Sequence, residues 1–100
     1  MMFWCKVFVA KHDTVVAVCD EELLDKNIKT KDLTIKISKN FYGGQKVDEK
    51  TVSQLLSIAT IGNLFGKNAV ELAKRHGLVA EENIISINGV LHAQFVKIIE

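Results

Sequence analysis

The pattern of apolar and polar residues predicts that the chain opens with a pair of β-strands. Residues 3–9 and 14–19 are rich in β-branched and aromatic side chains, and the polar segment 10–13 between them has the length of a hairpin turn. Residues 33–38 (LTIKIS) alternate apolar with polar, as a strand does when one face is buried and the other is wet. We therefore expect an opening β-hairpin and, further along, a half-buried strand.

A second hairpin is expected near the C-terminal end. Residues 84–87 and 90–99 are largely apolar and rich in isoleucine and valine. The two residues between them, Asn88 and Gly89, suit a type I′ turn because both tolerate positive φ. Such a turn sets the pairing register of the two strands.

Apolar residues at helical spacing predict two helices between the hairpins, near residues 48–61 and 63–76. The first begins at Asp48 or at Thr51, since either side chain can cap free N–H groups. The second ends before Gly77, because cations in the last turn favour the negative end of the helix dipole and glycine suits a left-handed cap. The glycines at 62 and 66 predict a stop or a bend between the two helices.

These elements predict an α+β fold: a single domain over residues 1–100, with an antiparallel or mixed β-sheet and two helices packed on one face. One further helical turn is expected at residues 20–24 (DEELL), where Asp20 caps the free N–H groups and acidic residues lie at the positive dipole end. The pattern does not specify the strand order.

Composition agrees with one ordinary globular domain, since 48% of the residues are hydrophobic and 25% are charged. The net charge of +1 is unevenly distributed: residues 1–25 carry −3, residues 26–46 carry +5 and residues 47–100 carry −1. Because the chain is nearly neutral, we do not expect it to coat nucleic acid without sequence specificity. The basic segment still permits a local contact with an anionic partner.

The sequence predicts a cytoplasmic protein. The apolar start is interrupted by Lys6 and lacks the features of a secretory signal, and residues 51–66 are too polar and too short to span a membrane. Two cysteines, Cys5 and Cys19, do not make a disulfide framework, so both are expected to be free thiols in the reducing cytosol.

The first candidate site is an aromatic glycine loop within the basic segment. A base stacked on an aromatic ring with phosphate near lysine is a known mode of single-strand recognition. The residues that fit this mode are Lys36, Lys39, Phe41, Tyr42, Gly43, Gly44 and Lys46. The simpler interpretation is a glycine turn anchored by two aromatic residues.

The second candidate is a pocket formed by Cys19, Asp20, His92 and Gln94. His92 and Gln94 share one face of the predicted last strand, and a thiol with an imidazole is compatible with nucleophilic catalysis. The simpler interpretation is ordinary hydrogen bonding by the polar pair and inert packing by the cysteine. The cysteines and histidines show no metal-ligand spacing, so neither a metal nor a cofactor is expected.

Residues 62–67 (GNLFGK) superficially resemble a phosphate-binding loop. The two glycines are one residue too close, Asn68 stands where the motif has Ser or Thr, and the preceding segment has a helical pattern rather than that of a strand. A nucleotide-binding loop is therefore not expected.

Several segments in order along the chain resemble a small archaeal family known as domain of unknown function 424. They are residues 16–24 (VAVCDEELL), 41–44 (FYGG), 59–64 (ATIGNL), 69–73 (AVELA) and 89–94 (GVLHAQ). The resemblance implies a stand-alone archaeal cytosolic protein of about this length, with no established reaction, ligand or catalytic residue to transfer. The family more often has alanine where this chain has Gly62, which predicts a sharper helix bend here.

Two functional hypotheses follow. The leading hypothesis is a non-catalytic binding module for RNA or a translation-associated protein, because the basic segment ends in the aromatic glycine loop and the catalytic constellations are poor. The alternative is a small enzyme or ligand-binding protein that uses the pocket around Cys19 and His92. Convergence of the four pocket residues in space would favour the alternative.

Overall fold

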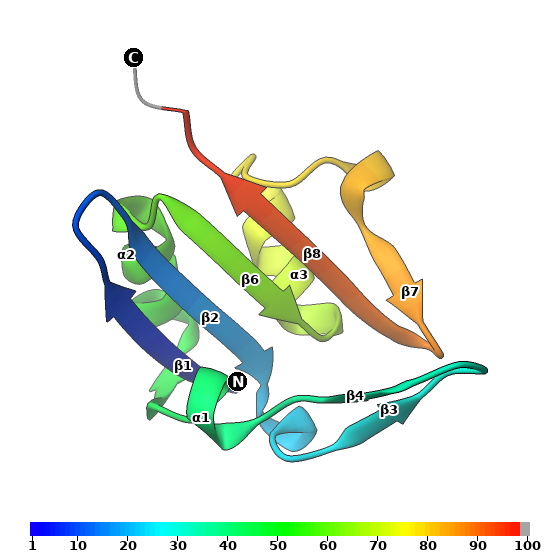
Figure 1. Cartoon of the computed structure of the whole chain (residues 1–100). Coiled ribbons are helices and arrows are strands. Elements are labelled where there is room, and N and C mark those ends of the chain that lie inside the picture. The colour runs from blue at the N-terminus through cyan, green and yellow to red at the C-terminus, as the bar shows by residue number, and fades with distance from the viewer. Residues whose placement is uncertain (99–100) are drawn as a thin grey trace.

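A six-stranded mixed β-sheet organises the chain in a computed structural model that describes residues 1–98 (Figure 1). Its spatial order is β5-β1-β2-β6-β8-β7; β2 and β6 run parallel, and all other neighbours are antiparallel. The strands are β1 (Met2–Val9), β2 (Thr14–Asp20), β5 (Gln45–Asp48), β6 (Ile61–Phe65), β7 (Ile85–Ile87) and β8 (Val90–Val96). This architecture confirms the predicted α+β fold class.

Both predicted terminal hairpins are present. In the first, β1 and β2 pair along seven positions, from Phe3 opposite Asp20 to Val9 opposite Thr14. In the second, the turn between β7 and β8 has positive φ at both Asn88 (48°) and Gly89 (86°), as the type I′ prediction requires. The expected strand extended to Ile99, which lies outside the described residues.

Two helices, α2 (Glu49–Ile58) and α3 (Lys67–Arg75), lie on one face of the sheet, behind it in Figure 1. Asp48 is the N-cap of α2, and its carboxylate accepts a hydrogen bond from the backbone N–H of Thr51. Gly77, with φ of 71°, follows the end of α3 as expected. The main core fills the space between these helices and the sheet. Its members include Phe3, Val16, Val18, Val52, Leu56, Leu64, Leu72 and Phe95.

The segment between the helices is a strand, so the prediction that helix resumes at residue 63 was wrong. Residues 61–65 form β6, which lies between β2 and β8 near the centre of the sheet. The expected helix bend at Gly62 is therefore absent. Glycine is needed there for another reason: a β-carbon on Gly62 would lie 1.9 Å from Cε2 of Phe95 on the neighbouring strand.

The opposite face of the sheet carries a second, smaller layer. It consists of the 3-10 turn η1 (Glu21–Leu23), the hairpin of β3 (Asn27–Lys29) and β4 (Thr34–Lys36), and the one-turn helix α1 (Lys39–Tyr42). The expected strand at residues 33–38 is thus β4, and its partner β3 was not predicted. This layer buries Ile28, Ile37 and Tyr42 against Ala17, Cys19 and Phe65 of the sheet. Much of the sheet on this side remains uncovered (Figure 1).

A 3-10 turn, η2 (Glu81–Asn83), connects α3 to the second hairpin. The longest helix has ten residues, and none within residues 1–98 is long and apolar enough to cross a membrane.

Candidate functional site: the basic hairpin surface

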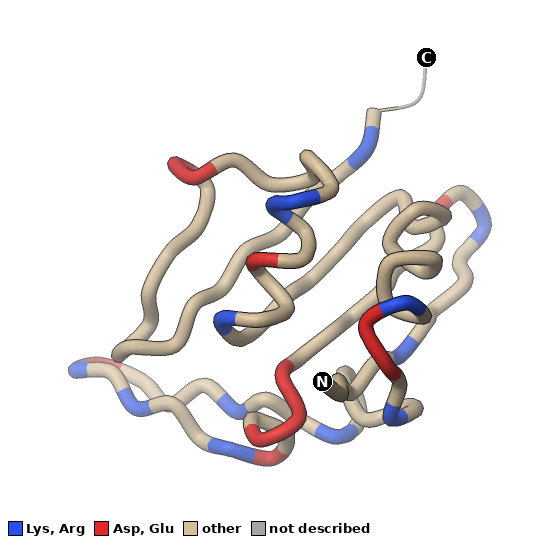
Figure 2. Tube along the Cα trace, turned by 180° about the vertical axis from the view of Figure 1, so that it is seen from behind, with Lys and Arg blue, Asp and Glu red and all other residues tan. Residues whose placement is uncertain are grey.

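Five of the six lysines of the basic segment lie on or directly before the β3–β4 hairpin and on α1, and Lys46 lies on β5. We call Lys26, Lys29, Lys31, Lys36 and Lys39 the basic hairpin surface; all five are exposed. The hairpin buries Ile28, which pairs with the partly buried Ile35, whereas Lys29 and Lys36 lie at alternate positions and point away from the sheet. Figure 2 shows the blue lysine segments along the hairpin at the lower edge of the molecule.

Acidic neighbours neutralise part of this charge. Asp25, which has a positive φ of 68°, lies 4.0 Å from the ammonium of Lys36 and 3.3 Å from that of Lys39. Lys46 pairs with Glu21 of η1. Within residues 1–98, Lys26, Lys29 and Lys31 form no ion pair.

Phe41 is the part of the aromatic loop that remains partly exposed. The side-chain oxygen of Ser38 accepts a hydrogen bond from the backbone N–H of Phe41 and starts the single turn of α1. The Phe41 ring stacks on Phe8 of β1 with centroids 5.3 Å apart and planes 22° from parallel. The ammonium of Lys6 lies 5.2 Å from the centroid of Phe8 and donates a hydrogen bond to the carbonyl of Asn40.

Tyr42 lies in the core rather than on the surface. Only 4% of the residue is exposed, and its ring meets Phe65 edge-on at a centroid distance of 5.8 Å. Its hydroxyl donates a hydrogen bond of 3.1 Å to the side-chain oxygen of Asn63 on β6. Burial raises the pKa of this hydroxyl well above its usual value. The ring face is consequently not presented to a ligand, and Tyr42 anchors α1 to the sheet.

The two glycines of the loop permit close approach of backbone segments. A β-carbon on Gly43 would lie 2.8 Å from the carbonyl oxygen of Lys39, and one on Gly44 would lie 2.6 Å from that of Cys5. Neither glycine has a positive φ. Their role is to let the chain pass from α1 over the edge of β1 into β5.

The four residues of the alternative pocket do not converge. Cys19 is fully buried on the hairpin side of the sheet, next to Phe65 of β6, which in turn lies next to His92 of β8. Two strand spacings of about 4.8 Å therefore separate the backbones of Cys19 and His92, with an aromatic residue between them. Burial, together with the nearby Asp20 carboxylate, raises the pKa of the Cys19 thiol to about 12.

Asp20 faces the helix side of the sheet and caps α3. Its two carboxylate oxygens accept hydrogen bonds from the backbone N–H groups of Asn68 (3.0 Å) and Ala69 (2.8 Å). The sequence-based prediction that Asp20 caps its own helical turn was wrong, since η1 has no side-chain cap. Because β6 leads directly into α3, residues 61–67 do have the strand-to-helix context of a phosphate loop. The carboxylate of Asp20, however, already occupies the position at the N-terminus of α3 where a phosphate would bind.

His92 and Gln94 border a shallow depression of about 500 Å³ with Glu82, Asn83 and Ile85. The His92 ring stacks on Phe65 at 4.1 Å, and its Nδ1 lies 2.9 Å from the carbonyl oxygen of Leu64. Nδ1 therefore donates the proton, which leaves Nε2 as an acceptor in the neutral ring. Burial lowers the pKa of His92, so the neutral form is favoured. Neither Cys19 nor Asp20 borders this depression.

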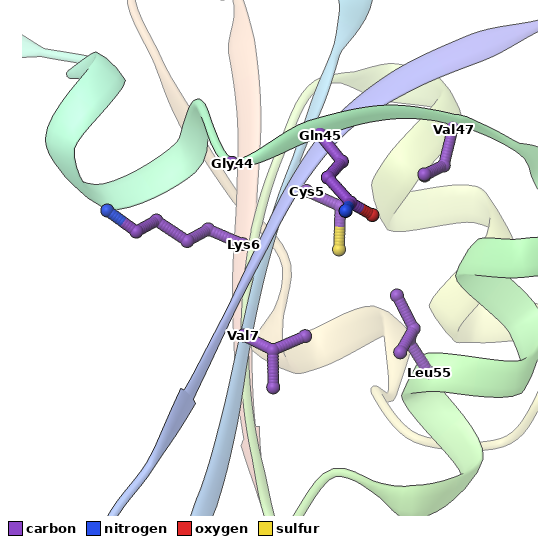
Figure 3. Close-up of a pocket in the computed structure, with 7 residues that line it drawn as sticks. All are labelled: Cys5, Lys6, Val7, Gly44, Gln45, Val47 and Leu55. Atoms are coloured by element: carbon purple, nitrogen blue, oxygen red, sulfur yellow. The ribbon is translucent and has the colours of Figure 1, made fainter.

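Sequence reasoning missed a second cavity, of about 380 Å³, at the edge of the sheet. It lies where β5 begins beside β1 and is lined by Cys5, Lys6, Val7, Gly44, Gln45, Val47 and Leu55 (Figure 3). The cavity arises from the length of β5 and the placement of α2, neither of which has a sequence signal. In the described part of the chain, no group of three His, Cys, Asp or Glu residues is placed to hold a metal ion.

Comparison with known proteins supports the fold and the family. The structure is similar to the crystal structure of an uncharacterized conserved protein from Methanopyrus kandleri, with a TM-score of 0.81 and 24% sequence identity. The match covers 100% of this chain and 96% of the other, and at this identity it establishes the fold alone. No curated protein matches the chain. The family model described as "Protein of unknown function (DUF424)" matches residues 9–98, and the chain belongs to this family.

Proposed function

We propose that this protein is a non-catalytic module that binds single-stranded RNA through the basic hairpin surface. The observation that carries the proposal is the exposure of Lys26, Lys29 and Lys31, which form no ion pair within residues 1–98. Lysine ammonium groups bind phosphate and release condensed counterions, so they supply affinity without sequence specificity. The hairpin projects from the sheet, which leaves its outer face accessible to a nucleic-acid backbone (Figure 1).

The arrangement supports a binding role better than a catalytic one. The thiol of Cys19 and the imidazole of His92 are separated by Phe65, and the carboxylate of Asp20 is engaged by α3. In residues 1–98, every buried side-chain nitrogen or oxygen atom already has a hydrogen-bond partner. Phe41 is the one loop aromatic on which a base can stack, because Tyr42 is buried.

The experiment is a salt titration of RNA binding by fluorescence anisotropy, with a labelled oligouridine of about twelve nucleotides as the probe. If each of the three lysines contacts one phosphate, the log-log salt slope is about −2, at roughly −0.7 per phosphate. Affinity then falls roughly 20-fold between about 50 and 200 mM salt. The triple variant Lys26→Gln, Lys29→Gln, Lys31→Gln removes most of this slope.

The matched control replaces Lys11, Lys50 and Lys67, which are also exposed and lie outside the hairpin, with glutamine. It changes the net charge equally, so an electrostatic contact local to the hairpin leaves its binding close to that of the wild type. Tyr42→Phe also keeps wild-type binding, because the tyrosine does not meet the ligand. Equal losses in both triple variants, or no binding by the wild type at low salt, would refute the proposal.

A further inference from the structure

One half of β1 has an unpaired outer edge. β5 pairs with β1 only from Met2, opposite Asp48, to Cys5, opposite Gln45. β2 pairs on the inner side along nearly the whole strand. Within residues 1–98, no strand therefore pairs with Lys6 to Val9 on the outer side, and Figure 1 shows this half of β1 at the margin of the sheet.

The hydrogen-bonding groups of this edge point outward at Val7 and Val9. The carbonyl oxygen of Cys5 lies close to the Gly44 backbone, 2.6 Å from the position of a β-carbon on that residue, so it points toward the β5 side. Because backbone groups alternate along a strand, those of Val7 and Val9 point the same way. The edge offers two N–H donors and two carbonyl acceptors to an extended chain.

Apolar surface accompanies this edge on the helix side of the sheet. Val7 and Val9 are 39% and 82% exposed and share the face of Cys5, and Ile58 of α2 is 62% exposed. Val7 also lines the cavity of about 380 Å³, together with Leu55 of α2. In Figure 3 the Cys5 sulfur, Val47 and Leu55 border the same space, while Lys6 points away from it toward α1.

We propose that the free edge of β1 binds an extended peptide segment of a partner protein by strand addition. The peptide backbone pairs with Val7 and Val9, and the side chain opposite Val7 enters the cavity beside Leu55. A second apolar side chain, opposite Val9, packs toward Ile58. The residue between them lies opposite Phe8 and points to the other face. There the ammonium of Lys6 lies 5.2 Å from the centroid of the Phe8 ring, where it complements an acidic side chain. The motif is therefore apolar, acidic, apolar.

The size of the edge favours a peptide over a second copy of the chain. Four residues extend over roughly 13 Å, and pairing two such edges buries far less than the roughly 1,000 Å² expected of a stable interface. A short peptide needs only this length, since main-chain hydrogen bonds supply affinity and one pocket supplies specificity.

The test uses the full chain and a fluorescein-labelled peptide with the sequence Ser-Leu-Glu-Val-Ser. Binding is measured by anisotropy up to about 1 mM protein, the weak end of the specific range. We expect saturable binding, slower hydrogen exchange of the Val7 and Val9 amides in the complex, and weaker binding when lysine replaces glutamate in the peptide. Absence of binding, or equal affinity for the lysine peptide, would overturn the motif.

Two variants locate the site. Val9→Pro removes one outward N–H from an edge position, where proline is tolerated, and lowers affinity about fivefold to tenfold by the loss of one hydrogen bond. Val9→Lys is compared with Ile85→Lys, which places the same charge on the exposed strand at the opposite edge. Only the Val9 variants weaken binding. Equal weakening by Ile85→Lys, or protection of amides outside β1, β5 and the cavity, refutes the location.

Discussion

The carboxylate of Asp20 is expected to be a main determinant of stability although it lies outside the helix that it caps. It is 3% exposed, and it accepts hydrogen bonds from the N–H groups of Asn68 and Ala69 at the start of α3. Gly66, the N-cap of α3, has no side chain that can supply these bonds. Asp20→Ala therefore leaves two N–H donors without an acceptor in a largely buried position.

The expected loss follows from these two bonds. A hydrogen bond to a charged group contributes about 1.5 to 3 kcal/mol, and the loss of a helix cap costs about 0.5 to 2 kcal/mol. The variant also relieves the cost of burying a carboxylate, so we expect a net loss of about 2 to 4 kcal/mol in the free energy of unfolding. Asp20→Asn retains one acceptor oxygen and should lose about half as much.

The measurement is urea denaturation followed by circular dichroism, with thermal unfolding as a second readout. A loss of about 3 kcal/mol lowers Tm by roughly 12 to 24 °C in a domain of this size. A change of less than about 0.5 kcal/mol, which is usual for a surface substitution, would refute the capping role.

The pH dependence gives an independent check. Burial raises the folded-state pKa of Asp20, and the two N–H groups oppose this shift. The part of the stability that depends on protonation of Asp20 is therefore complete below its unfolded pKa of about 3.9 and declines as the pH rises through the higher folded value. As the pH rises through this range, the difference in the free energy of unfolding between the wild type and Asp20→Asn becomes smaller. Asp48 shows the opposite pH dependence. The hydrogen bond from the N–H of Thr51 lowers the pKa of Asp48, so the stability that Asp48 contributes is lost as the pH falls.

Two further predictions concern the sheet. Gly62→Ala should destabilise the fold by about 1 to 3 kcal/mol, because the added β-carbon overlaps the Phe95 ring. Phe95→Leu in the same chain should recover part of this loss. If urea denaturation shows that the losses of the two substitutions simply add, this contact is not the cause. The two thiols should resist iodoacetamide at about pH 8 in the folded protein and react in urea, because burial raises the pKa of Cys5 to about 11 and that of Cys19 to about 12. Rapid labelling detected by mass spectrometry under native conditions would contradict this expectation.

Local patterns predicted the elements whose residues suffice to specify them. The hairpin of β7 and β8 follows from Asn88 and Gly89, since few residue pairs adopt two successive positive φ values. The end of α3 follows from the basic residues before Gly77 for a similar reason. The basic segment was equally visible, because charge is a property of the sequence.

Tertiary contacts decided the remaining features. Residues 61–65 have no strong strand pattern, and they form β6 because β2 and β8 provide hydrogen-bonding partners on both sides. The exposure of Phe41 and the burial of Tyr42 depend on which side of α1 meets the sheet. Lys36 and Lys39 form ion pairs with Asp25 because the chain brings Asp25 back toward them.

The sequence by itself determined the fold class, the terminal hairpins, the two helices and the place of the basic charge, because short-range backbone preferences and side-chain periodicity specify them. Only the tertiary structure decided the central strand, the capping of α3 by Asp20, the separation of Cys19 from His92 and the cavity beside β1. Each of these depends on contacts between residues far apart in the chain, and local periodicity carries no information about which distant segments meet.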